Sequence, residues 1–304
     1  MGGKFLKIGI LVAAVVGMIS CNNIENQDEQ RIIENEQAIE KYIADSSLSL
    51  TKDSNGFYYK ITQTGSGVKP EVGEEVTVKY DVYLLNGLKV WTSAKDTVKT
   101  AKFPAFTGYM FVVPGMELAL NLMKPGDKAT ILAPFYLGFG NYTSILSGFS
   151  TNATIPQYSP VRVDMEFVSK RTEVQQIDSY LTANKLTPTY RTSDNLIVVK
   201  TATVTEGDTI GPNKVVKIKY VGKLLNGTVF DEGKDVLQFT TGTGNSNLIT
   251  GFDRAIRKMK VNEKATIILP SATAYGKTGR ANSQGSNFVI KPYEPIMFNV
   301  EVQP

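Results

Sequence analysis

The chain carries the same series of sequence patterns twice, 136 to 140 residues apart. VTVKYDVYLLNG (76–87) and VKIKYVGKLLNG (216–227) alternate apolar and polar residues, as half-buried strands do, and each ends in Asn-Gly, which is typical of a tight hairpin turn. PGMELALNLMKPGDKATILAP (114–134) and TGFDRAIRKMKVNEKATIILP (250–270) each predict a short amphipathic helix followed by a strand. The 304 residues therefore fold as two related domains.

Each copy also begins with a helix pattern and ends with a strand pattern. EQAIEKYIADS (36–46) and EVQQIDSYLTAN (173–184) have one apolar face at helical spacing, and VRVDMEFV (161–168) and IMFNVEV (296–302) are apolar on alternate residues. Several strands and one internal helix per copy, without regular strand-helix-strand alternation, indicate the α+β class. We expect a bent antiparallel sheet wrapped around a short helix in each domain.

Composition excludes several kinds of catalytic site. The chain has no histidine, so a Ser-His-Asp triad, a Cys-His pair and a histidine-ligated zinc are all excluded. The single cysteine, Cys21, can form neither an internal disulfide nor a thiolate metal site. A formal net charge of +4 does not predict a nucleic-acid-binding protein, and no metal or organic cofactor is implied.

The N-terminal segment MGGKFLKIGILVAAVVGMISC (1–21) has two lysines, then an apolar run that is short for a membrane span. It resembles a bacterial lipoprotein signal, which is cut before a cysteine that then receives the lipid, although Met18 stands where leucine is commonest. Asn22 in place of aspartate after that cysteine favours the outer membrane in this resemblance. We therefore expect a protein anchored through Cys21 in the envelope of a Gram-negative bacterium, with the membrane face undetermined.

These patterns divide the chain into four segments. A polar tether should run into a helix whose isoleucines, Ile32, Ile33 and Ile39, cover part of the first domain together with Tyr42 and Ile43. The expected boundaries are a signal peptide (1–20), the lipidated cysteine and tether (21–35), a first domain with its N-terminal helix (36–171) and a second domain with its N-terminal helix (172–304).

The second copy resembles an FKBP-type peptidyl-prolyl cis-trans isomerase over residues 207–302. Four blocks carry the resemblance in the family's order: VKIKYVGKLLNGTVFDEG, LQFTTGTGNSNLITGFDRAIRKMKVNEKATIILP, TAYGKTG and FVIKPYEPIMFNVEV. The resemblance implies a pocket between the sheet and its helix. The pocket residues it implies are Tyr220, Phe230, Asp231, Leu237, Phe239, Leu248, Ile249, Phe252, Tyr275, Ile290 and Phe298.

An apolar pocket suits prolyl isomerisation, which needs no nucleophile or general base. The X-Pro bond passes through a twisted state that has lost amide resonance, against a barrier of about 18 to 20 kcal/mol for ordinary peptides. The planar amide is more charge-separated than the twisted one, so a dry pocket favours the twisted state.

The resemblance also implies roles for single residues. The Ile249 amide and the Tyr275 hydroxyl would bond substrate carbonyls, while Asp231, held by Tyr220, would face the twisting amide. Taken singly, each polar group is better explained by local hydrogen bonding, whereas taken together, in the family's order, they favour the pocket. Two departures stand out: Phe252 replaces the commoner tryptophan on the pocket floor, and Arg280 begins a divergent flanking loop, which leaves the substrate preference open.

The first copy keeps the pattern of the fold but loses the implied pocket. Val90, Trp91 and Phe139 occupy the positions of Phe230, Asp231 and Tyr275 in the second copy. The carboxylate and the hydroxyl are therefore missing. We expect the first domain to be inactive as an isomerase and to serve binding or docking.

The sequence thus predicts a peptidyl-prolyl cis-trans isomerase that helps envelope proteins fold, with its activity in the C-terminal domain. Its partners would be proline-containing unfolded or assembling proteins, with a larger outer-membrane complex as a further partner. The alternatives are a non-enzymatic lipid-anchored adaptor of an outer-membrane assembly and a general holdase chaperone. The adaptor gives no reason to keep Phe230, Asp231 and Tyr275 together in one copy.

Overall fold

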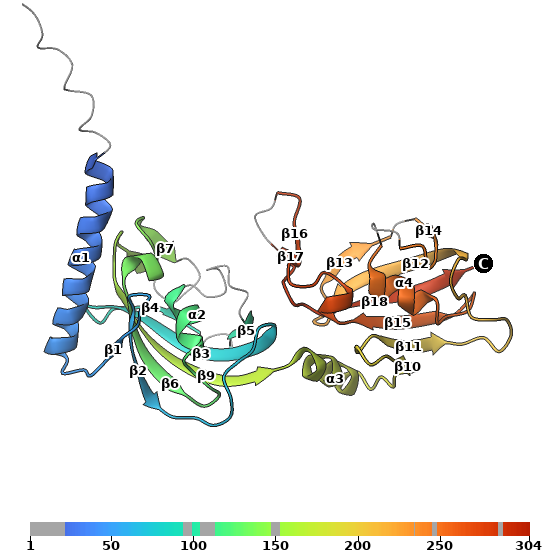
Figure 1. The fold of residues 1–304 in the computed structure, drawn as a ribbon, viewed down its shortest axis with the longest axis horizontal. Helices are drawn as coiled ribbons and strands as arrows, with labels where there is room; N and C mark the ends of the chain where they lie inside the picture. Colours follow the sequence, from blue (N-terminus) through green and yellow to red (C-terminus); the bar gives the residue numbers. More distant parts are fainter. Residues whose placement is uncertain are drawn as a thin grey trace, which may run out of the picture. The chain divides into compact units, whose positions relative to one another are not determined.

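The computed structural model contains two seven-stranded sheets, one in each copy of the repeat (Figure 1). This confirms the predicted α+β class with two domains of the same kind. The structure describes residues 22–93, 99–103, 113–146, 153–233, 235–244, 248–284 and 288–304.

The first sheet has the strand order β1-β2-β6-β9-β3-β4, and β5 also pairs with β3. A separate two-stranded sheet joins β7 (Ser144–Leu146) to β8 (Ala153–Ile155). The helices of this copy are α1 (Asn22–Asp45), α2 (Gly115–Leu120) and the 3-10 turn η2 (Phe135–Leu137). The sheet strands are β1 (Thr51–Lys52), β2 (Tyr58–Gln63), β3 (Glu74–Leu84), β4 (Lys89–Thr92), β5 (Lys99–Phe103), β6 (Lys128–Ala133) and β9 (Val161–Arg171).

The second sheet repeats this order strand for strand, as β10-β11-β15-β18-β12-β13 with β14 also paired to β12, and its pairs are antiparallel. A separate pair joins β16 (Arg280–Ala281) to β17 (Phe288–Ile290). The helices are α3 (Glu173–Ala183), α4 (Thr250–Ile256) and the 3-10 turn η3 (Ser271–Thr273). The strands are β10 (Tyr190–Arg191), β11 (Ile197–Ala202), β12 (Val215–Leu224), β13 (Val229–Glu232), β14 (Leu237–Thr240), β15 (Lys264–Leu269) and β18 (Ile296–Gln303).

The apolar alternation along the strands places one face of the second sheet against α4. On β12, Val216 and Ile218 are buried while Lys217 and Lys219 are exposed. The predicted helix stripe of the second copy is confirmed, because its four members are each at most 2% exposed and belong to one core. These are Phe252, Ala255, Ile256 and Met259.

Both predicted Asn-Gly hairpins form, but only the glycine of each pair has a positive φ. Gly87 and Gly227 have φ of 89° and 90°. In the second hairpin the Gly227 amide donates to the Leu224 carbonyl at 2.9 Å, and the Asn226 side chain accepts from the amide of Thr228 at 3.0 Å. The asparagine therefore acts through its side chain, while the glycine supplies the left-handed conformation.

An N-terminal helix covers the outer face of part of each sheet. In the second copy, Ile177 and Leu181 of α3 pack with Ile197, Ile268 and Met297. The N-cap Thr172 forms a capping box with Gln175. This confirms the helix predicted at 173–184.

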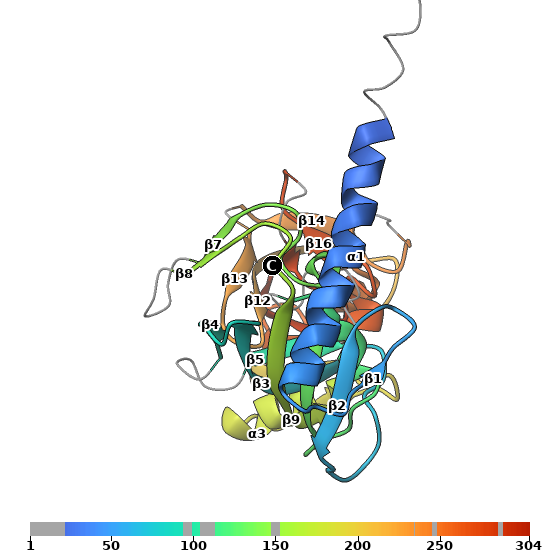
Figure 2. The same cartoon turned by 90° about the vertical axis from the view of Figure 1, so that its left-hand side faces the viewer.

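In the first copy, Ile39 of α1 packs with Tyr58 of β2 and with Leu132 of β6. Figure 2 shows α1 running beside β1 and β2. Tyr42 and Ile43 lie against the same cluster, as predicted.

The helix α1 is longer than the sequence suggested, because it begins at Asn22, within the segment expected to be a tether. Ile32 and Ile33 are 40% and 50% exposed, so they do not cover the domain as predicted.

Cys21 and the predicted signal peptide lie outside the described residues. Within the described part of the chain, no helix has the length and apolar character needed to cross a membrane.

A polar side chain anchors each N-terminal helix at the same point of its repeat. The buried Asn35 accepts a hydrogen bond from the Phe135 amide and donates one to the Tyr158 carbonyl, both at 2.9 Å. In the second copy, Glu173 accepts from the Ser271 amide and, at 3.1 Å, from the Ser271 hydroxyl. In each copy a proline follows a central strand, β6 or β15, and the side chain accepts a hydrogen bond from the amide directly after that proline.

Replacing Asn35 with alanine should destabilise the first domain by about 2 kcal/mol, because the buried Phe135 amide and Tyr158 carbonyl would both lose their partners. Urea unfolding followed by circular dichroism measures the loss. Gln37→Ala, at an exposed position of the same helix, is the control and should leave the transition unchanged. An unchanged transition in Asn35→Ala would contradict the proposed anchor.

Candidate active site

Five aromatic rings from five elements meet in the second domain. Phe252 of α4 and Phe298 of β18 are at the centre, with ring centroids 4.8 Å apart and an edge-to-face arrangement. Tyr220 of β12 lies 6.0 Å from Phe252 and 5.9 Å from Phe298. Phe230 of β13 lies 5.6 Å from Phe298, and Phe239 of β14 lies 6.4 Å from Phe252. Rings from α4 and from four strands of the sheet, β12, β13, β14 and β18, thus form one apolar wall.

A glycine makes room for these rings on the central strand. Gly222 of β12 pairs with Phe298 on one side and with Asp231 on the other. A Cβ at this position would lie 2.7 Å from Phe230 and 2.9 Å from Phe298. Gly222 therefore leaves the space in which both rings pack directly on the strand backbone. The sequence did not predict this need for glycine.

The cluster has a closed floor and an accessible rim. Phe252, Ile290 and Phe298 are at most 3% exposed, and Phe239 is 8% exposed. The rim residues are partly buried and pack against this floor: Tyr220, Phe230, Leu237, Leu248, Ile249 and Tyr275. Such a surface can take up an apolar ring on the floor while the attached backbone stays at the rim.

A carboxylate is held at the rim by a tyrosine. The Tyr220 hydroxyl donates to Oδ2 of Asp231 at 3.4 Å. Burial first, and then the negative charge of Asp231, raise the pKa of Tyr220 above its ordinary value. The hydroxyl therefore stays protonated and continues to donate, which fixes the carboxylate beside the rings.

Arg280 completes the rim. Its Nη1 donates to the Tyr275 hydroxyl at 3.3 Å and lies 3.9 Å from Oδ2 of Asp231. The guanidinium carbon is 5.9 Å from the ring centroids of both Phe230 and Tyr275. In the sequence, Arg280 is only a departure from the family pattern, and that departure was the one signal that could have identified it as a site residue.

The start of α4 offers a backbone donor beside the rings. Ile249 is the N-cap of this helix, with φ of −60° and ψ of 124°. Its carbonyl accepts from the amides of Phe252 and Asp253 at 3.0 and 3.2 Å, while its own amide donates to no acceptor among the described residues. An amide of this kind is available to a ligand carbonyl.

The structure brings all eleven predicted pocket residues together. Ten belong to one core cluster or pack against it, and Asp231 joins them through Tyr220. Their catalytic and substrate-binding roles stay predictions.

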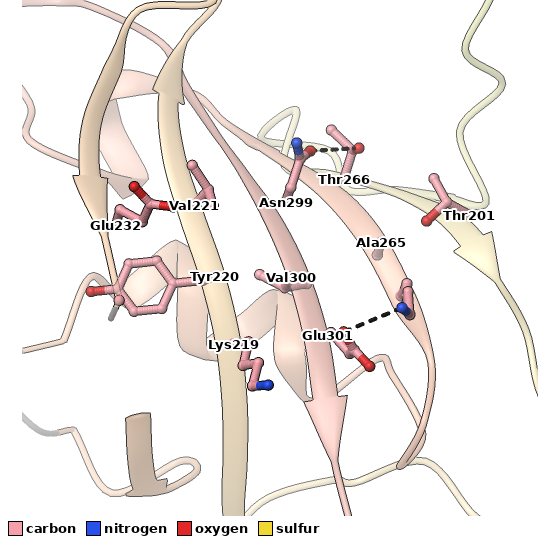
Figure 3. Close-up of a pocket in the computed structure, with 12 residues that line it drawn as sticks. Thr201, Lys219, Tyr220, Val221, Glu232, Ala265, Thr266, Asn299, Val300 and Glu301 are labelled. Carbon is pink, nitrogen blue, oxygen red and sulfur yellow. Dashed lines mark hydrogen bonds and ion pairs between the residues drawn. The ribbon is translucent and has the colours of Figure 1, made fainter. Parts of the chain in front are cut away.

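A separate hollow of about 520 Å³ lies on strands β11, β12, β15 and β18 (Figure 3). Tyr220 is the only predicted pocket residue among those that line it. Two pairs of its polar side chains contact each other: Thr266 donates to Asn299 at 3.0 Å, and Lys264 lies 3.2 Å from Glu301. Apart from Tyr220, its lining contains none of the five rings of the aromatic wall.

The corresponding positions of the first domain are more deeply buried. Tyr80, Val90 and Phe139 are 4%, 1% and 7% exposed, whereas their counterparts Tyr220, Phe230 and Tyr275 are partly exposed. The position of Asp231 is taken by Trp91, which has no carboxylate. The two copies therefore have the same sheet topology but differ in the residues at the rim.

The FKBP-type peptidyl-prolyl cis-trans isomerase family matches residues 66–168 and 207–303, more than half of the chain. Human peptidyl-prolyl cis-trans isomerase FKBP9 is 25% identical over 75% of this chain and 35% of its own length. Peptidyl-prolyl cis-trans isomerase Mip of Coxiella burnetii is 38% identical over 29% of this chain and 36% of its own. The chain thus spans about a third of each of these relatives.

Among solved structures, that of the three FKBP domains of wheat FKBP73 is similar over 84% of this chain and 98% of that chain, with 24% identity and a TM-score of 0.39. FkpA from Escherichia coli is similar over 49% of this chain and 64% of that chain, with 21% identity and a TM-score of 0.37. The family match, which covers both copies, shows that the chain belongs to the FKBP-type peptidyl-prolyl cis-trans isomerases.

Proposed function

We propose that this protein catalyses cis-trans isomerisation of X-Pro bonds and that the activity lies in the second domain. The observation that carries the proposal is the aromatic floor of Phe252 and Phe298 beside a carboxylate held by Tyr220. A proline ring fits an apolar floor of this kind, and the preceding amide would then lie at the rim near Asp231. Uncatalysed isomerisation takes tens to hundreds of seconds, so such an activity would accelerate slow folding steps.

The polar groups at the rim have different proposed roles at the twisting bond. The Ile249 amide and the Tyr275 hydroxyl would bind substrate carbonyls and fix the chain on either side of the bond. Asp231 would face the amide as it loses resonance. Water excluded by the rings makes each of these interactions stronger than it would be in solvent. No side chain exchanges a proton with the substrate in this scheme.

We further propose that the first domain binds or docks proteins without isomerising them. The missing carboxylate at Trp91 and the burial of Val90 and Phe139 support this division. The clients would be proline-containing unfolded or assembling proteins of a Gram-negative envelope. The resemblance of residues 1–21 to a lipoprotein signal supports anchoring through Cys21, with the outer membrane as the proposed location.

Asp231→Ala should lower kcat/KM of the full chain by about tenfold or more, since 1.4 kcal/mol of lost differential stabilisation has this effect. Tyr275→Phe should lower it by about two- to tenfold, as expected for one hydrogen bond. The measurement is a protease-free assay of cis-trans conversion in a proline peptide, together with a proline-limited refolding reaction.

Two control variants make this test specific. Trp91→Phe changes the counterpart of Asp231 in the first domain, and Lys264→Ala changes an exposed ion pair on the polar hollow. Both should retain the activity of the unaltered chain. If the folded, unaltered chain accelerates neither reaction, the enzymatic proposal is wrong and the non-enzymatic adaptor becomes the better explanation.

Cys21→Ser should abolish incorporation of radiolabelled fatty acid in a Gram-negative host and move the protein from the membrane fraction to the soluble fraction. The reason is that each acyl CH₂ contributes about 0.8 kcal/mol to membrane binding. Met18→Leu, which restores the residue commonest in such signals, is the control and should keep the label. Labelling that persists in Cys21→Ser would contradict the anchor.

A further inference from the structure

Arg280 projects a cation over the rim of the aromatic site. We propose that it is a specificity-determining residue, and that it binds an acidic side chain immediately before the proline of the substrate. The proposal rests on the proposed isomerase function of the second domain and adds a substrate class to it: Asp-Pro and Glu-Pro segments.

The backbone fixes the position of Arg280. On β16 it pairs with Ile290 of β17, whose side chain is fully buried in the core. The preceding Gly279 has φ of 63°, and a Cβ there would lie 2.4 Å from the Ile290 carbonyl oxygen. The Gly279 amide also donates to the Tyr275 carbonyl at 3.1 Å. Arg280 is therefore held by a turn that only glycine can form and by a buried strand partner.

Among the described residues, Arg280 has fewer hydrogen-bond acceptors than a guanidinium can use. A guanidinium has five N–H donors. Within the described residues, the polar partners of this one are the Tyr275 hydroxyl at 3.3 Å and the Asp231 carboxylate at 3.9 Å, the latter longer than a hydrogen bond. The side chain is 38% exposed. Its remaining donors form a planar fork that matches a carboxylate from the substrate.

The other charges at the rim set the size of the effect. Asp231 is 39% exposed on its side chain and repels a substrate carboxylate, but the Tyr220 hydroxyl and Arg280 both offset its charge. Glu232 and Asp235 are exposed acids on the neighbouring hairpin, and Lys277 is an exposed base on the Arg280 loop. Among the described residues, Arg280 is the cation whose contacts reach Tyr275 and Asp231, so it decides whether an acidic substrate is attracted or repelled.

The contacts of Arg280 also indicate which substrate residue its guanidinium would bind. It bridges Tyr275 and Asp231, the two groups placed around the twisting bond. That bond joins the proline to the residue before it, so the side chain of the preceding residue starts from the amide that Asp231 faces. The residue after the proline is attached through the proline Cα and carbonyl, so its side chain begins several bonds farther from that amide.

The test compares Ala-Glu-Pro-Phe with Ala-Gln-Pro-Phe peptides as substrates of the full chain. The unaltered protein should favour glutamate in kcat/KM by roughly fivefold, the upper end for a partly exposed ion pair. The preference should disappear in about 1 M salt, where the Debye length falls to about 3 Å. Arg280→Gln should bring the glutamate-to-glutamine ratio below one, because Asp231 then acts alone, and Arg280→Lys should restore part of the preference.

Using the ratio within each variant removes any general effect of Arg280 on the rate. Lys277→Gln, a change of equal charge on the same loop, should keep the ratio of the unaltered protein. A ratio of one or less in the unaltered protein, or a ratio unchanged in Arg280→Gln, would overturn the proposal. Absence of activity on both peptides would instead refute the proposed function, and titrating the two peptides by NMR would then test the acidic preference as binding.

Discussion

The contact between Phe252 and Phe298 joins α4 to the second sheet. α4 has seven residues, too few for a stable isolated helix, so its position depends on packing. The two rings meet at 4.8 Å, an arrangement worth about 0.5 to 1.5 kcal/mol beyond the apolar area they bury. The helix start at Ile249 and the ring wall of the rim are fixed by the same contact. Core packing and site geometry are therefore inseparable at this point.

The two copies retain the interactions that hold the fold and differ in those that build the site. In each copy a buried acid, Asp127 or Glu263, accepts a hydrogen bond from the backbone amide three residues before it, at 2.9 and 2.8 Å. Asn35 and Glu173 likewise anchor their helices at equivalent strand ends. Asn35, Asp127 and Glu263 are buried, and Glu173 is partly buried. Each accepts a backbone hydrogen bond, so losing any of them costs stability. At the rim, Trp91 pairs with Val82 as Asp231 pairs with Gly222, so the same strand pairing accommodates either side chain.

Periodicity in the sequence was sufficient to predict the long central strands and the internal helices, because burial on one face directly sets the spacing of apolar residues. Phe252 and Met259 were predicted to share a stripe, and both are buried in one core. The family resemblance grouped the pocket residues. Neither signal reports backbone conformation or close approach. Three features were not predicted: a positive φ at Gly227 but not at Asn226, the space that Gly222 leaves for the rings, and the start of α1 at Asn22. They depend on tertiary contacts or on local geometry that the residue pattern does not encode.

The position of Arg280 illustrates the same limit, since it follows from a register shift between Arg280 and Ala281 in a short strand pair. In that pair Ile290 is buried and Val289 packs against the core, while the outer residues, Ala281 and Phe288, are exposed. Mutations in the outer part of the hairpin can therefore accumulate without unfolding the domain. A hairpin of this kind can change which side chains border the site while the sheet, the helix and the aromatic floor of the second domain stay in place.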